Sequence, residues 1–205
     1  MEIGRKDFRS EAEPTFRDIF FISEGTTIKV FNRVFILRFG VEAIPQEEYR
    51  GLVSLLLELL KARFGERLVS VVVFGSVGRG EAKPESDVDV LVVCEDFDKS
   101  LHRRTDELVD IILQLREREG KPPEKQVWIQ FHPLRPEEAL INRPIYLDMI
   151  EDGVIIHDRK HFMENVLRRL SERLKELGSR RVYLPDGSWY WILKPTIKRG
   201  EILEI

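Results

Sequence analysis

Residues 69–93 of this 205-residue chain, VSVVVFGSVGRGEAKPESDVDVLVV, bring glycines, an arginine and two aspartates into one short span. The apolar run ending at Phe74 predicts a buried strand, and Gly75 and Ser76 follow it directly. Glycines at such a place leave backbone N–H groups open to an approaching anion. We therefore expect Gly75 and Ser76 to bind phosphate, with the Ser76 hydroxyl as a further donor.

Charged side chains flank this glycine corner. Arg79 stands three residues beyond Ser76 and would bring a positive charge toward the same anion. Asp87 and Asp89 are two residues apart at the start of an apolar strand, so both carboxylates should point to one face. Two like charges held that close require a cation, and oxygen ligands with no His or Cys in the segment favour Mg²⁺ or Mn²⁺.

Each of these features also has an ordinary structural explanation. Glycines after a strand are usually a turn, and an Asp-x-Asp pair is commonly a solvated strand end. The combination is more informative, because a strand, an anion corner, an arginine, a short loop and paired carboxylates rarely assemble by chance. We therefore interpret residues 69–93 as a metal-dependent phosphate site.

The elements around the segment predict an α/β (α+β) fold with a mixed central sheet flanked by helices. Helical spacing of leucines predicts a helix between Pro45 and Gly65. The remaining core elements are expected as strands at 68–74, 87–93, 127–131 and 154–156, a helix that starts at about 101 and ends at Glu119 and Gly120, and two short helices between 136 and 153.

Both ends of the chain predict β-hairpins outside this core. Strand-like residues on either side of Glu24 and Gly25 predict an N-terminal hairpin, and a Pro-Asp-Gly turn at 185–187 predicts a C-terminal one. We expect three parts: an N-terminal β-rich appendage at 1–44, a core at 45–158, and a C-terminal part at 159–205. That last part joins an amphipathic helix to a hairpin and carries eleven Lys and Arg against six Asp and Glu.

Composition narrows the class of protein. The chain is 42% hydrophobic and 34% charged, which is typical of a globular protein, and no apolar stretch approaches the roughly 20 residues that cross a bilayer. The polar N-terminus lacks the apolar region of a secretory signal, so we expect a cytoplasmic protein without membrane contact. The single cysteine, Cys94, lies in an apolar run and is expected to pack. High charge with few Cys and Met suits a thermophile.

GSVGRG at 75–80 and SDVDVLVV at 86–93 resemble the GSxxRG and SDxDxxV signature of the DNA polymerase β superfamily, especially its minimal bacterial and archaeal nucleotidyltransferases. The resemblance is strong over about residues 65–95 and extends, by element order, to about residue 158. The stretch from 144 onward resembles the tails of archaeal members. It implies the nucleotidyltransferase fold, similar to the polymerase β palm.

The resemblance also implies roles for individual residues. Gly75 and Ser76 match the pair that holds the β and γ phosphates, Asp87 and Asp89 match the catalytic metal carboxylates, and Arg79 matches the motif arginine. The implied enzyme moves a nucleoside monophosphate, expected to be AMP from ATP, to a hydroxyl on a protein or small molecule and releases pyrophosphate. Its expected cofactor is Mg²⁺ or Mn²⁺.

The chain departs from the superfamily pattern on the next strand, where active members usually carry a third carboxylate. Residues 127–134, VWIQFHPL, contain no Asp or Glu, and Gln130 takes the equivalent place with His132 on the same face. His132 is a candidate base or ligand, although a structural role is the commoner outcome. Four helical carboxylates are candidate substitutes, each more often simply solvated: Asp106, Glu107, Asp110 and Asp148.

Other functions stay open at this point. The missing carboxylate also fits a catalytically weakened nucleotide-binding module, or an antitoxin-like partner of a helical protein as the resemblance implies. An RNA-binding protein using the basic tail ranks lower, since no aromatic-basic module is present, and we expect no nucleic-acid partner. Trp189 and Trp191 share a strand face, where packing is the default and base stacking the alternative.

Overall fold

A mixed sheet of five strands forms the centre of the computed structural model, which describes residues 18–23, 26–31, 37–198, 200–203 and 205. The strands lie in the order β3, β7, β4, β5, β6. Their bounds are Arg38–Phe39 (β3), Leu68–Phe74 (β4), Val88–Cys94 (β5), Ile129–Leu134 (β6) and Val154–Asp158 (β7). The β3–β7 and β5–β6 pairs are parallel, whereas β4 runs antiparallel to both β5 and β7. The predicted mixed central sheet is confirmed.

Helices cover both faces of this sheet because its strands are apolar on both sides. Helices α1 (Glu47–Phe64) and α3 (Leu101–Glu119) lie side by side on one face, where they bury Val71 and Val73 of β4. Helices α4 (Pro136–Ala139), α5 (Pro144–Asp152) and α6 (Phe162–Leu177) cover the other face, over Val72 and Phe74. Every residue of β4 is buried, which fixes the corner that follows it.

Helix ends fall where the sequence predicts them. Gly65 ends α1 with a φ of 52°, and Gly178 ends α6 in the left-handed region with a φ of 68°. The glycine-rich corner itself forms a short helix, α2 (Gly75–Arg79). Short 3₁₀ turns cover Val41–Ala43, Gly65–Arg67, Pro123–Lys125 and Arg159–His161.

Strand β6 extends further along the chain than the sequence predicted, to Leu134 rather than 131. Pro133 made a strand unlikely there, since proline cannot donate to a ladder. β6 is an edge strand with β5 as its sheet neighbour, so a missing donor is tolerated.

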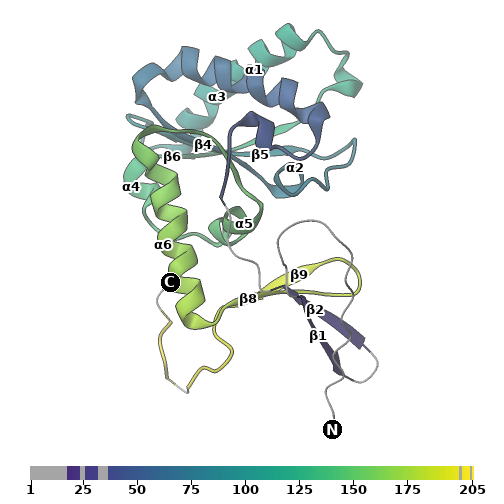
Figure 1. Cartoon of the computed structure of the whole chain (residues 1–205). Coiled ribbons are helices and arrows are strands. Elements are labelled where there is room, and N and C mark those ends of the chain that lie inside the picture. The colour runs from purple at the N-terminus through teal and green to yellow at the C-terminus, as the bar shows by residue number, and fades with distance from the viewer. Residues whose placement is uncertain (1–17, 24–25, 32–36, 199, 204) are drawn as a thin grey trace.

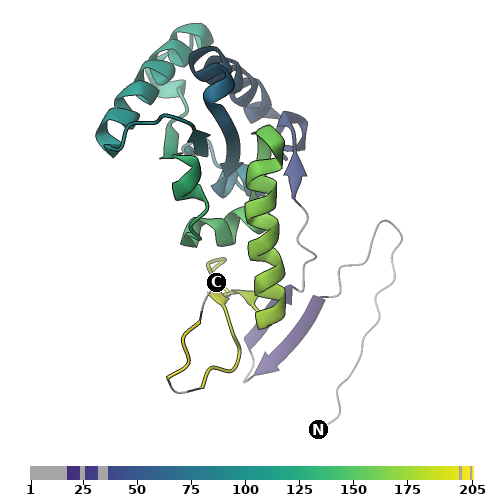
Figure 2. The ribbon, with the colours of Figure 1, turned by 90° about the vertical axis from the view of Figure 1, so that its left-hand side faces the viewer.

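A second sheet of four strands joins the two ends of the chain. It contains β1 (Asp18–Ser23), β2 (Thr26–Phe31), β8 (Arg180–Tyr183) and β9 (Trp189–Ile192). Both hairpins are confirmed, although the turn residues 24 and 25 lie outside the described residues. Val30 of β2 pairs with Val182 of β8, so the hairpins form one sheet that the sequence did not predict. Helix α6 runs from the central sheet to this small sheet (Figures 1 and 2).

The single cysteine and the lengths of the helices bear on two further expectations. Cys94 is wholly buried, and burial raises the pKa of its thiol to about 12, as expected of a packing cysteine. In the described part of the chain no helix combines the length and apolar character needed to span a membrane.

Candidate active site

The Asp89 carboxylate lies directly against the backbone of Gly75. Asp89 is the register partner of Phe74, the last residue of β4, so the turn into α2 passes beside its side chain. Gly75 has a φ of 68°, and a Cβ atom added there would lie 2.2 Å from Asp89 Oδ2. Only glycine fits both the conformation and the space. The structure thus brings the predicted phosphate corner and one predicted metal carboxylate together.

Asp87 and Asp89 flank a residue that points to the opposite side of the sheet. Val88 is wholly buried in the cluster under α1 and α3, together with Val90. Asp89 lies on the other face, with 22% of its side chain exposed. Asp87 directly precedes β5, and strand alternation predicts that its carboxylate lies on the Asp89 side.

Strand β6 borders Asp89 on the side away from β4. Gln130 is the register partner of Asp89 and is exposed. His132 lies on the same face, with Nε2 3.7 Å from Asp89 Oδ1 and its ring centroid 5.2 Å from that of Phe74. Its Nε2 atom is buried without a hydrogen-bond partner among the described residues. Gln130 thus lies opposite Asp89 on the neighbouring strand, and its equivalence to the third carboxylate of the superfamily stays a prediction.

The four candidate substitutes are directed elsewhere. Asp106 pairs with His102 at 3.8 Å on the surface of α3, and Glu107 pairs with Arg63 of α1 at 3.8 Å. Asp148 accepts a hydrogen bond from the Trp189 indole at 3.3 Å, and Asp110 is exposed. Over the described ranges, no three His, Cys, Asp or Glu residues are arranged to hold a metal ion.

Arg79 points away from the glycine corner. Its guanidinium lies 3.6 Å from the buried carboxylate of Asp152, at the end of α5, and 4.4 Å from the Trp189 ring centroid on β9. It also donates to Glu81 at 3.1 Å. The structure therefore shows Arg79 as a link between α2 and the small sheet, and its contact with phosphate stays a prediction.

Arg181 of β8 completes this link and was not singled out in the sequence. Its side chain is wholly buried and donates to Asp152 at 2.8 Å and to Glu151 at 2.9 Å, and its guanidinium carbon lies 4.2 Å from the Trp189 ring centroid. Burial raises the pKa of Asp152, while Arg181 and Arg79 oppose that shift. No spacing rule connects residues so distant in sequence, so sequence patterns could not reveal this cluster.

Close backbone packing also fixes α2 against α5. A Cβ atom at Gly78 would lie 2.5 Å from the Asp152 carbonyl oxygen, so glycine allows the two helices to touch. The Arg38 guanidinium donates to the Gly78 carbonyl at 2.6 Å and also to the Asp152 carbonyl. The phosphate corner is therefore attached to a charged, mostly buried framework.

The donor set of the corner fits a hard divalent cation. Mg²⁺ is usually bound by one or two carboxylates together with substrate phosphates, rather than by a cage of protein ligands. Asp87 and Asp89 supply two carboxylates beside amides suited to phosphate, so these residues could hold Mg²⁺ or Mn²⁺ jointly with a triphosphate.

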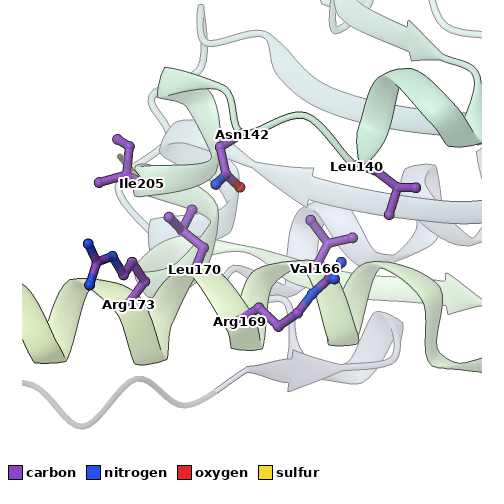
Figure 3. Close-up of a pocket in the computed structure, with 7 residues that line it drawn as sticks. All are labelled: Leu140, Asn142, Val166, Arg169, Leu170, Arg173 and Ile205. Carbon is purple, nitrogen blue, oxygen red and sulfur yellow. The ribbon is translucent and has the colours of Figure 1, made fainter. Parts of the chain in front are cut away.

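A separate groove lies between α6 and the segment joining α4 to α5 (Figure 3). Its polar lining comes from Asn142, Arg169 and Arg173, and the remainder is apolar. Arg173 is already paired with Glu176 at 3.1 Å. None of the predicted site residues lines this groove, so it is distinct from the glycine corner.

A mixed sheet whose strand turns through a glycine corner against a carboxylate-bearing neighbour strand defines the nucleotidyltransferase class of fold. Comparison with known proteins agrees. The sequence profile of the nucleotidyltransferase domain matches residues 53–146. A protein of Methanocaldococcus jannaschii that bears the name protein adenylyltransferase is 31% identical over 125 residues, covering 59% of this chain and 80% of that protein. The chain belongs to the nucleotidyltransferase family and is a transferase enzyme.

Two solved structures are similar to this chain at low sequence identity. A crystal structure of a toxin–antitoxin with AMP-PNP is 13% identical with a TM-score of 0.40, covering 61% of this chain and 91% of that chain. A crystal structure of a nucleotidyltransferase from Sulfolobus solfataricus is 19% identical with a TM-score of 0.37, covering 56% and 86% of the two chains.

Proposed function

We propose that this enzyme transfers AMP from ATP to a hydroxyl group of a protein and releases pyrophosphate. The contact between the Gly75 backbone and the Asp89 carboxylate carries the proposal, because the residue proposed to bind phosphate lies directly beside a residue proposed to hold the metal. The adenylyl group and the protein acceptor are supported by the name of the Methanocaldococcus relative. The three-part division of the chain stays a prediction.

Each site residue has a role in this proposal. Gly75 and the Ser76 hydroxyl hold the terminal phosphates, which leave as pyrophosphate. Asp87 and Asp89 would hold a divalent cation, which when bound would neutralise charge on the transferring group. The acceptor oxygen bonds to the α-phosphorus as the bridging bond to the β-phosphate breaks, and the hydroxyl proton is released. The protein contributes position and charge rather than a covalent intermediate.

A second function, nucleotide binding without turnover, is favoured by one observation. Gln130 lies opposite Asp89, where a carboxylate would help to hold a second cation. A neutral amide is a weaker ligand for Mg²⁺ than a carboxylate. In that case the protein would bind ATP and metal and present the complex to a partner.

A nucleotide-transfer assay separates the two functions. Wild-type protein and Asp89→Asn are each incubated with α-labelled ATP, CTP, GTP or UTP, with Mg²⁺ or Mn²⁺, and with protein acceptors. We expect ATP-dependent labelling and pyrophosphate release, both reduced at least about a thousandfold by Asp89→Asn. Metal-dependent ATP binding by the wild type without labelling or pyrophosphate release would support the binding module instead.

A further inference from the structure

In-line transfer determines the side from which an acceptor must enter, provided that the proposed function holds. The attacking and leaving oxygens lie on opposite sides of the α-phosphorus. The leaving pyrophosphate is assigned to the corner at Gly75, which adjoins Asp89 from the β4 side. The acceptor must therefore approach Asp89 from the opposite side, where β6 forms the edge of the sheet.

Helix α3 packs against β6, so one flank of α3 lies along the β6 edge of the sheet. On its other flank, α3 is tied to α1 by Arg63–Glu107 at 3.8 Å and by Glu58–Arg118 at 2.7 Å. The flank turned away from α1 carries Arg116, whose guanidinium lies 4.8 Å from the Trp128 ring centroid. Trp128 directly precedes β6, and its carbonyl accepts a hydrogen bond of 2.8 Å from the Val88 N–H, between the two aspartates.

Exposed apolar side chains gather on this same flank. Val109 and Leu113 are one helical turn apart and are 42% and 56% exposed, and Trp128 is 68% exposed. Leu101, two turns before Val109 on the same stripe, is 62% exposed. We call Leu101, Val109, Leu113 and Trp128 the α3 flank. Large apolar side chains grouped on a surface usually mark an interaction site.

A row of carboxylates borders the α3 flank. Asp106, Asp110 and Glu117 lie one turn from Val109 or Leu113 on the helix surface and are exposed. Asp106 faces His102, whereas Asp110 and Glu117 have no ion-pair partner among the described residues. Such a border repels phosphate backbones, anionic lipid surfaces and the same border of a second copy. It attracts a polypeptide with basic side chains beside an apolar stripe.

We propose that the α3 flank is the docking surface for the acceptor protein, which binds through an amphipathic helix with an apolar stripe and basic borders. Docking there places the partner along the β6 edge, from which its acceptor hydroxyl would reach around the edge to Asp89 and Gln130 on the other face of the sheet. The surface lies outside the nucleotide corner, so it selects the acceptor without contacting ATP. The Arg116–Trp128 stack forms the end of the surface nearest the two aspartates.

Binding of defined peptides tests this docking surface without relying on chemistry. The probe is a fluorescein-labelled peptide about five helical turns long, with a leucine stripe bordered by lysines, and its comparison peptide carries glutamates in place of the lysines. Anisotropy is measured without ATP or metal, for wild type and for the double variant Val109→Glu with Leu113→Glu. The matched control is Leu140→Glu with Ile141→Glu, two neighbouring residues that are 52% and 63% exposed on another surface.

We expect wild type and control to bind the lysine peptide equally, the α3-flank variant to bind it at least about tenfold more weakly, and the glutamate peptide not to bind. Equal binding by the two double variants would overturn the proposal, as would equal binding of both peptides. A wild-type dimer that Leu113→Glu converts to a monomer would assign the surface to a second copy and also overturn it. ATP binding measured on the same variants reports the nucleotide site independently, so failure of transfer and failure of docking are distinguishable.

Discussion

The two sides of Asp89 differ in how they are built. On the β4 side, the Gly75 backbone touches the carboxylate and Arg79 is held against Asp152 and Trp189. On the β6 side, Gln130 is exposed and Trp128 is largely in solvent. The β4 side is packed and its charges are paired, whereas the β6 side is open.

This difference matches the two substrates of a transfer reaction. Every nucleoside triphosphate carries the same leaving group, so a rigid corner can be organised for it in advance. A protein acceptor brings its own surface and needs open space beside the reacting atoms.

The largest effect is expected at Arg181. Replacing it with methionine leaves Asp152 buried without its main partner, and breaking a buried ion pair costs about 3–5 kcal/mol. Urea denaturation at neutral pH should show a loss of that size for Arg181→Met. Arg180→Met, in the same strand, should lose less than about 1 kcal/mol, and equal losses for both variants would contradict the central role of the cluster.

At Gly75, a single methyl group should impair transfer. The added Cβ would collide with Asp89 Oδ2 at 2.2 Å and would sit at a φ of 68°. Displacing a catalytic carboxylate by about 1 Å can cost about a hundredfold in rate, so we expect Gly75→Ala to lose AMP transfer by about that factor.

The control for Gly75 is Gly120→Ala. Gly120 has a φ of 60° but no atom within 4 Å of the added Cβ, so it shares the backbone strain without the collision. Its transfer rate should stay within about twofold of wild type, with thermal melts confirming that both variants fold. A similar loss of transfer in both variants would show that the Asp89 contact is unimportant.

The free energy of unfolding should fall in acid because Glu138, which pairs with Arg104 near the C-terminal end of β6, becomes protonated. Arg104 donates to Glu138 at 2.6 Å and to the Pro133 carbonyl at 3.3 Å, and the hydrogen bonds from Arg104 lower the Glu138 pKa to about 2. A folded-state pKa below the ordinary value of 4.5 means that this stabilisation is complete above about pH 4.5 and is lost as the pH falls to about 2.

Chemical denaturation at pH 6 and pH 3 measures this contribution. Glu138→Gln should lower the unfolding free energy by about 2 kcal/mol at pH 6 and by less at pH 3. Glu137→Gln is the control, because the Glu137 side chain is 61% exposed in its ion pair with Arg135. That variant should change stability by less than about 1 kcal/mol at either pH. If the loss of unfolding free energy in Glu138→Gln were as large at pH 3 as at pH 6, the low pKa of Glu138 would be refuted.

The smallest effect is expected at Gln130. Gln130→Asp would place a carboxylate opposite Asp89, where the superfamily usually carries one, and should lower the Mn²⁺ concentration for half-maximal transfer by about threefold to tenfold. The comparison variant is Gln126→Asp, whose native amide bonds the Lys121 carbonyl at 3.0 Å. An unchanged Mn²⁺ requirement for Gln130→Asp would mean that the β6 side takes no part in binding metal.

Local patterns in the sequence were sufficient for most of the fold. The apolar run before Gly75 predicted β4, and leucine spacing with Gly65 predicted α1, because both depend on residues close in the chain. The pairing of Val30 with Val182 could not be predicted, since it joins strands with no shared local signal. The end of β6 at Leu134 was not predicted, because a strand that contains Pro133 is tolerated at a sheet edge and edge position cannot be known from one strand alone.

The candidate site shows the same division. The glycine corner and the paired aspartates share one segment, and their proximity followed from a turn between adjacent strands. The contacts of Arg79 with Asp152 and Trp189 could not be predicted in this way, because these residues come from distant parts of the chain and meet only through packing.

A crystal structure with Mg²⁺ and a non-hydrolysable ATP analogue tests the central claim most directly. We expect the β and γ phosphates at Gly75 and Ser76, the cation on Asp87 and Asp89, and the free side of the α-phosphorus facing Gln130. A triphosphate bound away from the glycine corner would contradict the proposed function. So would an α-phosphorus whose free side, opposite the leaving group, faces Trp189.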